Sequence, residues 1–291
     1  MQWQGRRESG QVRDVRGQGG GGGGGGIGLL MMIGRVFGFK GILIAVVIGG
    51  LLWVTGIIDP MKFLEGGGSP SGNQGLVISP AEEERFDFVK VVLADTEDVW
   101  TKEFERLGLK YELPTLSIYR DQVRTGCGNG SAAMGPFYCP QDQNIYIDLG
   151  FYDDLAQTFQ SPGDFAKAYV LAHEVGHHVQ TLLGTTAKVN AARGRSDANQ
   201  MSVRLELQAD FLAGVWTKHS QGYLDQGDIE EAMTAANAIG DDAIQKKAQG
   251  KVVPHAFTHG TSAQRMRWFK KGLQSGKLED GDTFSIPYKD L

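Results

Sequence analysis

The sequence has little cysteine and histidine and no excess of positive charge. Its 291 residues include 2 cysteines and 6 histidines, and 34 acidic residues outnumber 29 basic ones. An acidic chain does not suggest nucleic-acid binding, and we expect no nucleic-acid partner. The two cysteines lack a close Cys-x-x-Cys spacing, which argues against a cysteine-based zinc site. The search for chemistry therefore turns to the histidines and carboxylates.

The first part of the chain lacks what a folded core requires. Residues 19–26 are an uninterrupted glycine tract, and residues 41–58 (GILIAVVIGGLLWVTGII) carry no charge over 18 positions, long enough to span a bilayer. Because 40 residues precede this run, we expect an uncleaved anchor rather than a signal peptide. We therefore divide the chain into a glycine-rich basic tail (1–40), a transmembrane helix (41–58), a flexible linker (59–79) and one folded domain (80–291).

The distribution of charge predicts an orientation in the membrane. Residues 1–58 hold six basic and two acidic residues, a net charge of +4, which leaves −9 for the remainder. By the positive-inside rule, the N-terminus is cytoplasmic, residues 41–58 contact lipid, and the folded domain is periplasmic or extracellular. Cys127 and Cys139 agree with this placement, since they bracket a loop rich in glycine and proline that suits a disulfide in an oxidising compartment. Two free buried thiols are the alternative.

The pattern of the remaining residues predicts an α+β domain, mainly helical with a small sheet. Residues 79–82 form a helix start, and apolar residues then recur at helical spacing as far as Leu107. Polar and apolar residues alternate over 115–119 and 144–149, which indicates short half-buried strands on either side of the cysteine loop.

A helix over residues 161–184 carries the clearest functional pattern. Ser161 can cap its first turn, and Gly184 is a suitable stop. Within it, His173 and His177 stand four residues apart on one face, so both imidazoles can bind one Zn²⁺, while Glu174 can point at a water on the metal. This is the H-E-x-x-H arrangement of a catalytic zinc site. The alternative is a set of polar residues on an exposed helix face.

A second long helix, over residues 197–220, offers carboxylates for the same metal. Glu206 and Asp210 lie on one face, among small residues that would let this helix approach the first one closely. We predict that Glu206 is the third ligand and that Asp210 orients one imidazole through its other ring nitrogen. Spacing alone does not decide which acid binds the metal.

Another histidine, His259, immediately precedes a predicted capping box at residues 261–264. A hydrolytic zinc site needs a hydrogen-bond donor for the oxyanion, and His259 is the best-placed candidate by sequence. A surface role is the alternative. His178 lies about 100° around the helix from His177, so we expect it to pack or to be solvated.

Together, several segments resemble the bacterial membrane-anchored neutral zinc metallopeptidases: MQWQGRRES, the glycine tract, TGCGNGSAAMGPFYCP, YIDL, LAHEVGHHVQ, LELQADFLAGVW and HGTSAQR. The resemblance implies a zincin fold of the gluzincin type, in which His173, His177 and Glu206 bind zinc and Glu174 is the base. The spacing of His259 and Arg265 is similar, more distantly, to that in peptidases related to the CAAX prenyl endopeptidase. Those usually have proline in place of the glycine that follows His259 here.

These observations lead to an expected function and a rival. The expected function is hydrolysis of peptide bonds in peptide or protein substrates by a zinc-activated water, with Glu174 as the base. The rival is a non-catalytic metal-binding scaffold tethered to the membrane. Glu174 argues against the rival, because a closed structural site has no use for this carboxylate.

Overall fold

Two parallel strands form the centre of the sheet. The structure is a computed structural model that describes residues 1–18 and 77–291. In it, β2 (Thr115–Tyr119) pairs in parallel with β6 (Asn144–Asp148), which confirms the two predicted strands. They are buried on both faces rather than half-buried, because helices cover one face and an aromatic cluster around Tyr146 covers the other. Parallel strands are commonly covered in this way.

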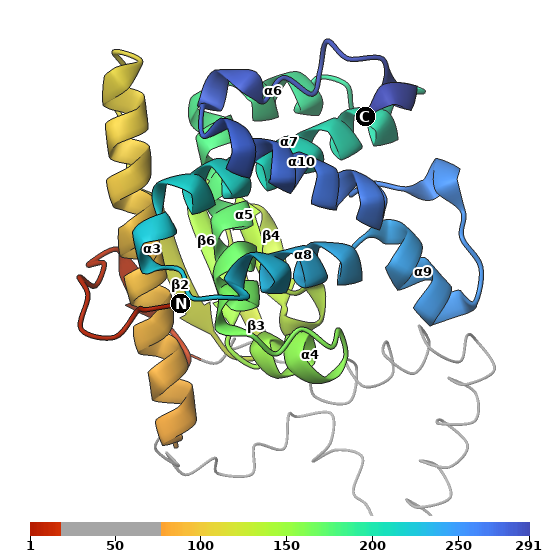
Figure 1. Ribbon diagram of the computed structural model, residues 1–291. Coiled ribbons are helices and arrows are strands. Elements are labelled where there is room, and N and C mark those ends of the chain that lie inside the picture. The colour runs from red at the N-terminus through yellow and green to blue at the C-terminus, as the bar shows by residue number, and fades with distance from the viewer. Residues whose placement is uncertain (19–76) are drawn as a thin grey trace, which may run out of the picture. The chain divides into compact units, whose positions relative to one another are not determined.

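Short strands complete the sheet, which has the order β1-β2-β6-β5 (Figure 1). At one edge, β1 (Val12–Asp14) runs parallel to β2, and at the other, β5 (Phe137–Cys139) runs antiparallel to β6. A separate hairpin consists of β3 (Gln122–Thr125) and β4 (Gly128–Ser131).

The predicted disulfide joins this hairpin to the edge of the sheet. Cys127 lies in the turn between β3 and β4, and Cys139 is the last residue of β5. Their sulfur atoms are bonded and their Cα atoms are 5.8 Å apart, within the normal range for a disulfide. The bond therefore fixes the hairpin beside strand β5.

Helices form most of the described part of the chain and surround α5. Their bounds are α3 (Pro80–Arg106), α4 (Phe151–Gln157), α5 (Asp164–Leu182), α6 (Thr185–Asn190), α7 (Ala198–His219), α8 (Asp228–Ala238), α9 (Asp241–Gln249) and α10 (Ser262–Ser275). Single 3₁₀ turns lie at η1 (Ala132–Met134), η2 (Gln221–Tyr223), η3 (Pro254–Ala256), η4 (Leu278–Asp280) and η5 (Tyr288–Asp290). Helix α5 contacts α3, α7, α8 and β5, so it occupies the centre of the fold (Figure 1).

The start of α5 differs from the prediction. The helix begins at Asp164, after an N-cap at Gly163 that provides no side chain, and Ser161 does not cap it. Instead, the carboxylate of Glu231, on α8, accepts a hydrogen bond from the backbone N–H of Phe165 at 3.0 Å. A long-range contact thus replaces the local cap. The predicted stop is confirmed, since Gly184 has a left-handed φ of 77°.

Residues 1–18 belong to the folded domain, which corrects the prediction of a separate tail over residues 1–40. The segment Met1–Gly19 forms one compact unit with Ile78–Leu291, and β1 adds a parallel strand beside β2. The ring of Trp3 lies edge-on to that of Phe88 on α3, with centroids 5.5 Å apart. The N-terminal segment therefore contributes both to the sheet and to the core.

Most of the arginines in this N-terminal segment are bonded to carboxylates. Arg6 pairs with the buried Asp95 on α3. The other pairs are Arg7 with Glu97 and Asp98, and Arg16 with Asp14, Glu82 and Glu83. Arg13 has no ion pair within the described residues. Three of the positive charges that entered the prediction of membrane orientation, those of Arg6, Arg7 and Arg16, thus hold the segment on the domain.

The pairing of β1 with β2 constrains any membrane topology. A single crossing between residues 18 and 77 would place the two strands on opposite sides of a bilayer, where they cannot pair. A cytoplasmic N-terminus combined with an extracytoplasmic domain is therefore incompatible with this sheet. The predicted span, 41–58, and most of the predicted linker lie outside the described residues. Within 1–18 and 77–291, no helix is long and apolar enough to cross a membrane.

The first prediction concerns the N-terminal segment. We expect Arg6→Ala to lower the free energy of unfolding of the full-length protein by about 3 kcal/mol, because it leaves the buried carboxylate of Asp95 without its ionic partner. Arg13→Ala is the matched control and should change stability by less than about 0.5 kcal/mol. Urea denaturation of both variants measures the difference. Equal stability of the two would show that the segment does not pack as described.

Candidate metal centre

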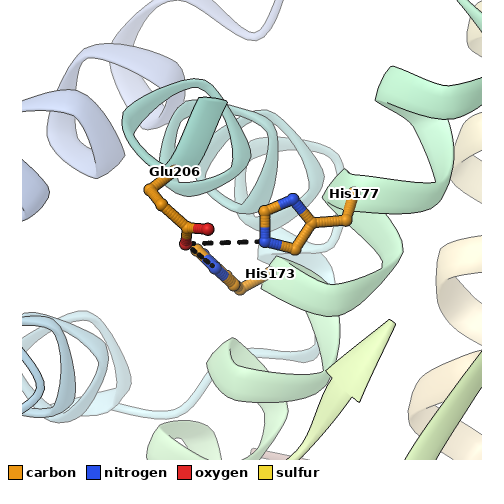
Figure 2. A group of neighbouring side chains, drawn as sticks. All are labelled: His173, His177 and Glu206. Atoms are coloured by element: carbon orange, nitrogen blue, oxygen red, sulfur yellow. Dashed lines mark hydrogen bonds and ion pairs between the residues drawn. The ribbon is translucent and has the colours of Figure 1, made fainter. Parts of the chain in front are cut away.

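The three predicted ligands converge between α5 and α7 (Figure 2). Oε2 of Glu206 lies 3.1 Å from Nε2 of His173 and 3.5 Å from Nε2 of His177. Ligand atoms at tetrahedral zinc distances of about 2.0–2.2 Å would lie about 3.3 Å from one another, so the spacing suits this ion. Within the described residues, no other group of three or more histidines, cysteines or carboxylates is close enough to hold a metal.

A close contact between the two helices makes this convergence possible. A Cβ atom on Gly176 would lie 3.0 Å from the carbonyl oxygen of Ala209 and 3.2 Å from its Cα atom. Backbone atoms cannot easily move aside, so a larger residue would push the helices apart. The small residues that the sequence places near His177 and Glu206 are therefore needed at this crossing.

Asp210 holds His173 from the side opposite the ligand atom. Its Oδ1 lies 2.8 Å from Nδ1 of His173 and accepts a hydrogen bond from the hydroxyl of Tyr169 at 2.5 Å. Arg265, on α10, donates to both oxygens of Asp210 at 2.9 Å. Because a carboxylate only accepts hydrogen bonds, Nδ1 of His173 carries the hydrogen and Nε2 remains for a metal. The predicted role of Asp210, to orient an imidazole through its other ring nitrogen, requires this hydrogen bond to Nδ1 of His173, and the structure contains it.

The charges in this cluster shift the pKa of both partners. Burial opposes ionisation of Asp210, but the positive charges of Arg265 and His173 outweigh it and lower the pKa to about 2. Burial also opposes a charged His173, but the charge of Asp210 and hydrogen bonds to Asp210 and Glu206 raise its pKa to about 9. An imidazole must be neutral to bind a metal, so metal uptake competes with protons here.

His177 is oriented in the same manner by a residue that the sequence did not reveal. Oε1 of Gln180 lies 2.9 Å from Nδ1 of His177, and Nε2 of Gln180 donates to the carbonyl oxygen of Leu205 at 2.7 Å. Gln180 is fully buried and thus links the ring to the backbone of α7. The only sign of this role in the sequence is that Gln180 lies about one turn after His177. The sequence analysis named Arg265 only for its spacing from His259 and did not predict its bonds to Asp210.

Glu174 is buried beside the ligands. Only 8% of its surface is exposed. Burial raises the pKa of its carboxyl group above the usual 4.5, and the positive charges of His177 and His173 partly oppose this shift. A carboxylate with a raised pKa accepts a proton more readily near neutral pH. This is the property that the predicted base requires.

His259 lies in the turn before α10 and is not part of the ligand group. Its side chain is 53% exposed, and its Nδ1 lies 3.3 Å from Oδ1 of Asp241. The hydrogen bond to Asp241 raises the pKa of His259, and the negative charge of Glu206 adds to this effect. The residue after it, Gly260, lies against the side chains of Val203 and Leu207 on α7, so the turn of His259 is beside the helix that carries Glu206.

His178 has the packing role expected of it. The ring is fully buried, with Nδ1 3.1 Å from the hydroxyl of Tyr138 and Nε2 2.6 Å from the carbonyl oxygen of Glu112. Burial lowers its pKa, which favours the neutral ring. His178 therefore joins α5 to strand β5 and takes no part in the ligand group.

The donors suit a catalytic rather than a structural metal. Two imidazole nitrogens and one carboxylate are the ligands of open zinc sites, in which a fourth position is left for water or substrate. Each imidazole has its second nitrogen engaged, so the ligand atoms are already oriented. The site is therefore a candidate zinc centre, with the H-E-x-x-H residues on one helix and a carboxylate ligand on the other.

Comparison with known proteins gives the family. Residues 1–284 match the sequence profile of the family described as "Putative neutral zinc metallopeptidase", and the chain therefore belongs to it. A relative from Escherichia coli strain K12, "Uncharacterized protein YpfJ", is 48% identical over 98% of this chain and 99% of its own length. "Uncharacterized protein Rv2575" of Mycobacterium tuberculosis is 44% identical over 60% of this chain and 64% of its own. No solved structure matches the chain.

The second prediction separates the third ligand from the carboxylate behind His173. Glu206→Ala removes one of three donors and should largely abolish zinc binding. Asp210→Asn keeps the size of the side chain but weakens its hold on His173, so zinc affinity should fall by about 10- to 100-fold. Zinc content by mass spectrometry should rank wild type first, then Asp210→Asn, then Glu206→Ala. Lys218→Ala, an exposed position on α7, is the control. The reverse order would make Asp210 the ligand.

Proposed function

We propose that this protein is a zinc-dependent peptidase. The observation that carries the proposal most directly is that the buried Glu174 directly follows His173, one of three convergent ligands. His173, His177 and Glu206 would hold the ion. Zinc bound there would supply Lewis-acid chemistry and lower the pKa of a coordinated water toward about 7. The family description, which names a zinc metallopeptidase, supports the same assignment.

Glu174 is the general base in this proposal. It is the residue after His173 on α5, it is buried, and the charges of His177, His173 and Glu206 all act on its carboxyl group. It takes a proton from the attacking water and passes it to the leaving amine. A purely structural metal site would not need this carboxylate, and the described residues provide three protein ligands rather than four.

We propose peptides or unfolded protein segments as the substrates. A metal-activated water beside a general base suits hydrolysis of the peptide bond, and the family description names a peptidase.

His259 is the proposed donor to the oxyanion. Its ring is half exposed and lies near Glu206, where a substrate carbonyl would be polarised. A donor at this position stabilises the charge that develops on the carbonyl oxygen during attack.

The proposed location is the membrane, with the domain outside the cytoplasm. The apolar run at 41–58 supports contact with lipid, and the disulfide between Cys127 and Cys139 supports an oxidising compartment. Because β1 pairs with β2, residues 1–18 share that compartment with the domain.

The third prediction tests catalysis. Glu174→Gln keeps the size of the side chain but cannot accept the proton, so peptide cleavage should fall by at least about 10²-fold while zinc content stays at the wild-type level. Asp164→Asn, an exposed acid at the start of the same helix, should cleave normally. Cleavage of a mixed peptide library, read by mass spectrometry, provides the measurement. Undiminished cleavage by Glu174→Gln would refute the assignment of the base.

A further inference from the structure

We propose that Asp241 is a positioning residue that holds the ring of His259 toward the metal centre. The inference rests on the proposed function, because it concerns how His259 is presented to a substrate. Asp241 is the first residue of α9 and belongs to neither ligand helix. No sequence motif drew attention to it.

The carboxylate of Asp241 binds the whole turn that precedes α10. Its Oδ2 accepts hydrogen bonds from the backbone N–H groups of Thr258 and His259, each at 2.7 Å, and of Gly260 at 3.1 Å. Its Oδ1 lies 3.3 Å from Nδ1 of His259, and the hydroxyl of Thr258 lies 3.0 Å from the same nitrogen. One carboxylate thus contacts both the backbone and the ring of the same histidine.

The same turn is fixed on its other side against α7. Gly260 has a left-handed φ of +89°, and a Cβ atom there would lie 3.3 Å from the side chains of Val203 and Leu207. These two residues flank Glu206 in the sequence of α7. The contact therefore sets how far the backbone of His259 lies from the helix that carries the third ligand.

The contact of Gly260 with Val203 and Leu207 places the turn of His259 beside the part of α7 that carries Glu206, and the charges of the two groups influence each other. The hydrogen bond to Asp241 raises the pKa of His259, burial opposes this, and the charge of Glu206 adds to the increase while that of Arg265 opposes it. Conversely, the positive charge of His259 contributes to the lowered pKa of Glu206. With Nδ1 engaged and the side chain half exposed, the Nε2 edge is the one that a substrate can reach.

The chemistry of the pair suits donation to an oxyanion. The contact with Asp241 requires a hydrogen on Nδ1 of His259, because a carboxylate only accepts hydrogen bonds, and the hydroxyl of Thr258 can accept from the same nitrogen. For Nε2 to donate as well, the ring must be an imidazolium, which the negative charge of Asp241 favours. Its Nε2–H can then bond to the negative charge that develops on the carbonyl oxygen. Asp241 acts through His259 and does not itself touch the substrate.

The fourth prediction compares Asp241→Asn with Asp242→Asn in the full-length, zinc-loaded protein. Asparagine keeps an acceptor oxygen for the backbone but lacks the charge. Asp242 is the matched control, since its carboxylate accepts from the backbone N–H and hydroxyl of Ser262 at 2.7 and 2.8 Å and has no hydrogen bond to His259. We expect Asp241→Asn to lower kcat/KM by about 10- to 100-fold with zinc content retained, and Asp242→Asn to change it less than about threefold.

Two further readouts distinguish positioning from a structural role. In the double variant Asp241→Asn/His259→Gln, the loss of kcat/KM should be no larger than that of His259→Gln alone, because both changes disable the same group.

The second readout is the pH profile. In the wild type, kcat/KM should fall as pH rises through the pKa of His259. In Asp241→Asn, this fall should move to lower pH, toward about 6.5. Additive losses with an unmoved pH profile would overturn the proposal.

A measurement without catalysis completes the test. An NMR titration of the His259 ring should give a lower pKa in Asp241→Asn than in the wild type, and an equal pKa in the two would overturn the proposal. If the variant does not fold, the wild type decides, since a pKa of His259 above about 6.5 supports the contact and one at or below it refutes it. If the wild type cleaves no peptide, the proposed function fails, while this titration still reports on Asp241.

Discussion

The buried carboxylate of Asp210 joins the helices on which the metal centre depends. It lies on α7 and is bonded to His173 on α5 and to Arg265 on α10, with no surface exposed to water. Removing such charges from water costs several kcal/mol each, so the cluster is stable only when every partner is in place. The same bonds leave Nε2 of His173 directed at Glu206. Helix packing and ligand geometry are therefore coupled, because a shift of α10 would move Arg265 and Asp210 and, through them, His173 on α5.

The N-terminal segment gives the domain an unusual chain order. Strand β1 pairs beside β2, although the 58 residues from 19 to 76 lie between it and α3, the next element that the structure describes. Arg6 and Arg16 bind carboxylates on or near α3, so charges that would ordinarily indicate a cytoplasmic tail serve to close the fold. The sequence predicted the positive charge of this segment but not its role. An arginine looks the same in a sequence whether it binds a lipid phosphate or a carboxylate that is 66 or 89 residues away along the chain.

The sequence predicted the three metal ligands more completely than the residues that hold those ligands in place. His173, Glu174 and His177 follow from one helical turn, and Glu206 from a second helix of the right composition. The groups behind the ligands were only partly accessible. Asp210 shares a helix face with Glu206, so its spacing carried a signal, whereas the hydrogen bonds of Arg265 and Gln180 depend on how α5, α7 and α10 cross. Such crossings are set by small residues such as Gly176, whose contact partner the sequence does not name.

By itself, the sequence determined what is local: the spacing of the H-E-x-x-H residues, the caps of α3 and α10 and the two central strands. These features depend on hydrogen bonds between near neighbours in the chain and on the backbone periods of helix and strand, which are the same in every protein. The structure resolves the choice between a disulfide and two free thiols in favour of the bond between Cys127 and Cys139. Only the tertiary structure decided that residues 1–18 complete the sheet and that Asp241 holds the turn of His259. Both depend on segments distant in the chain meeting at one place, and that meeting results from packing of the whole domain rather than from any local pattern.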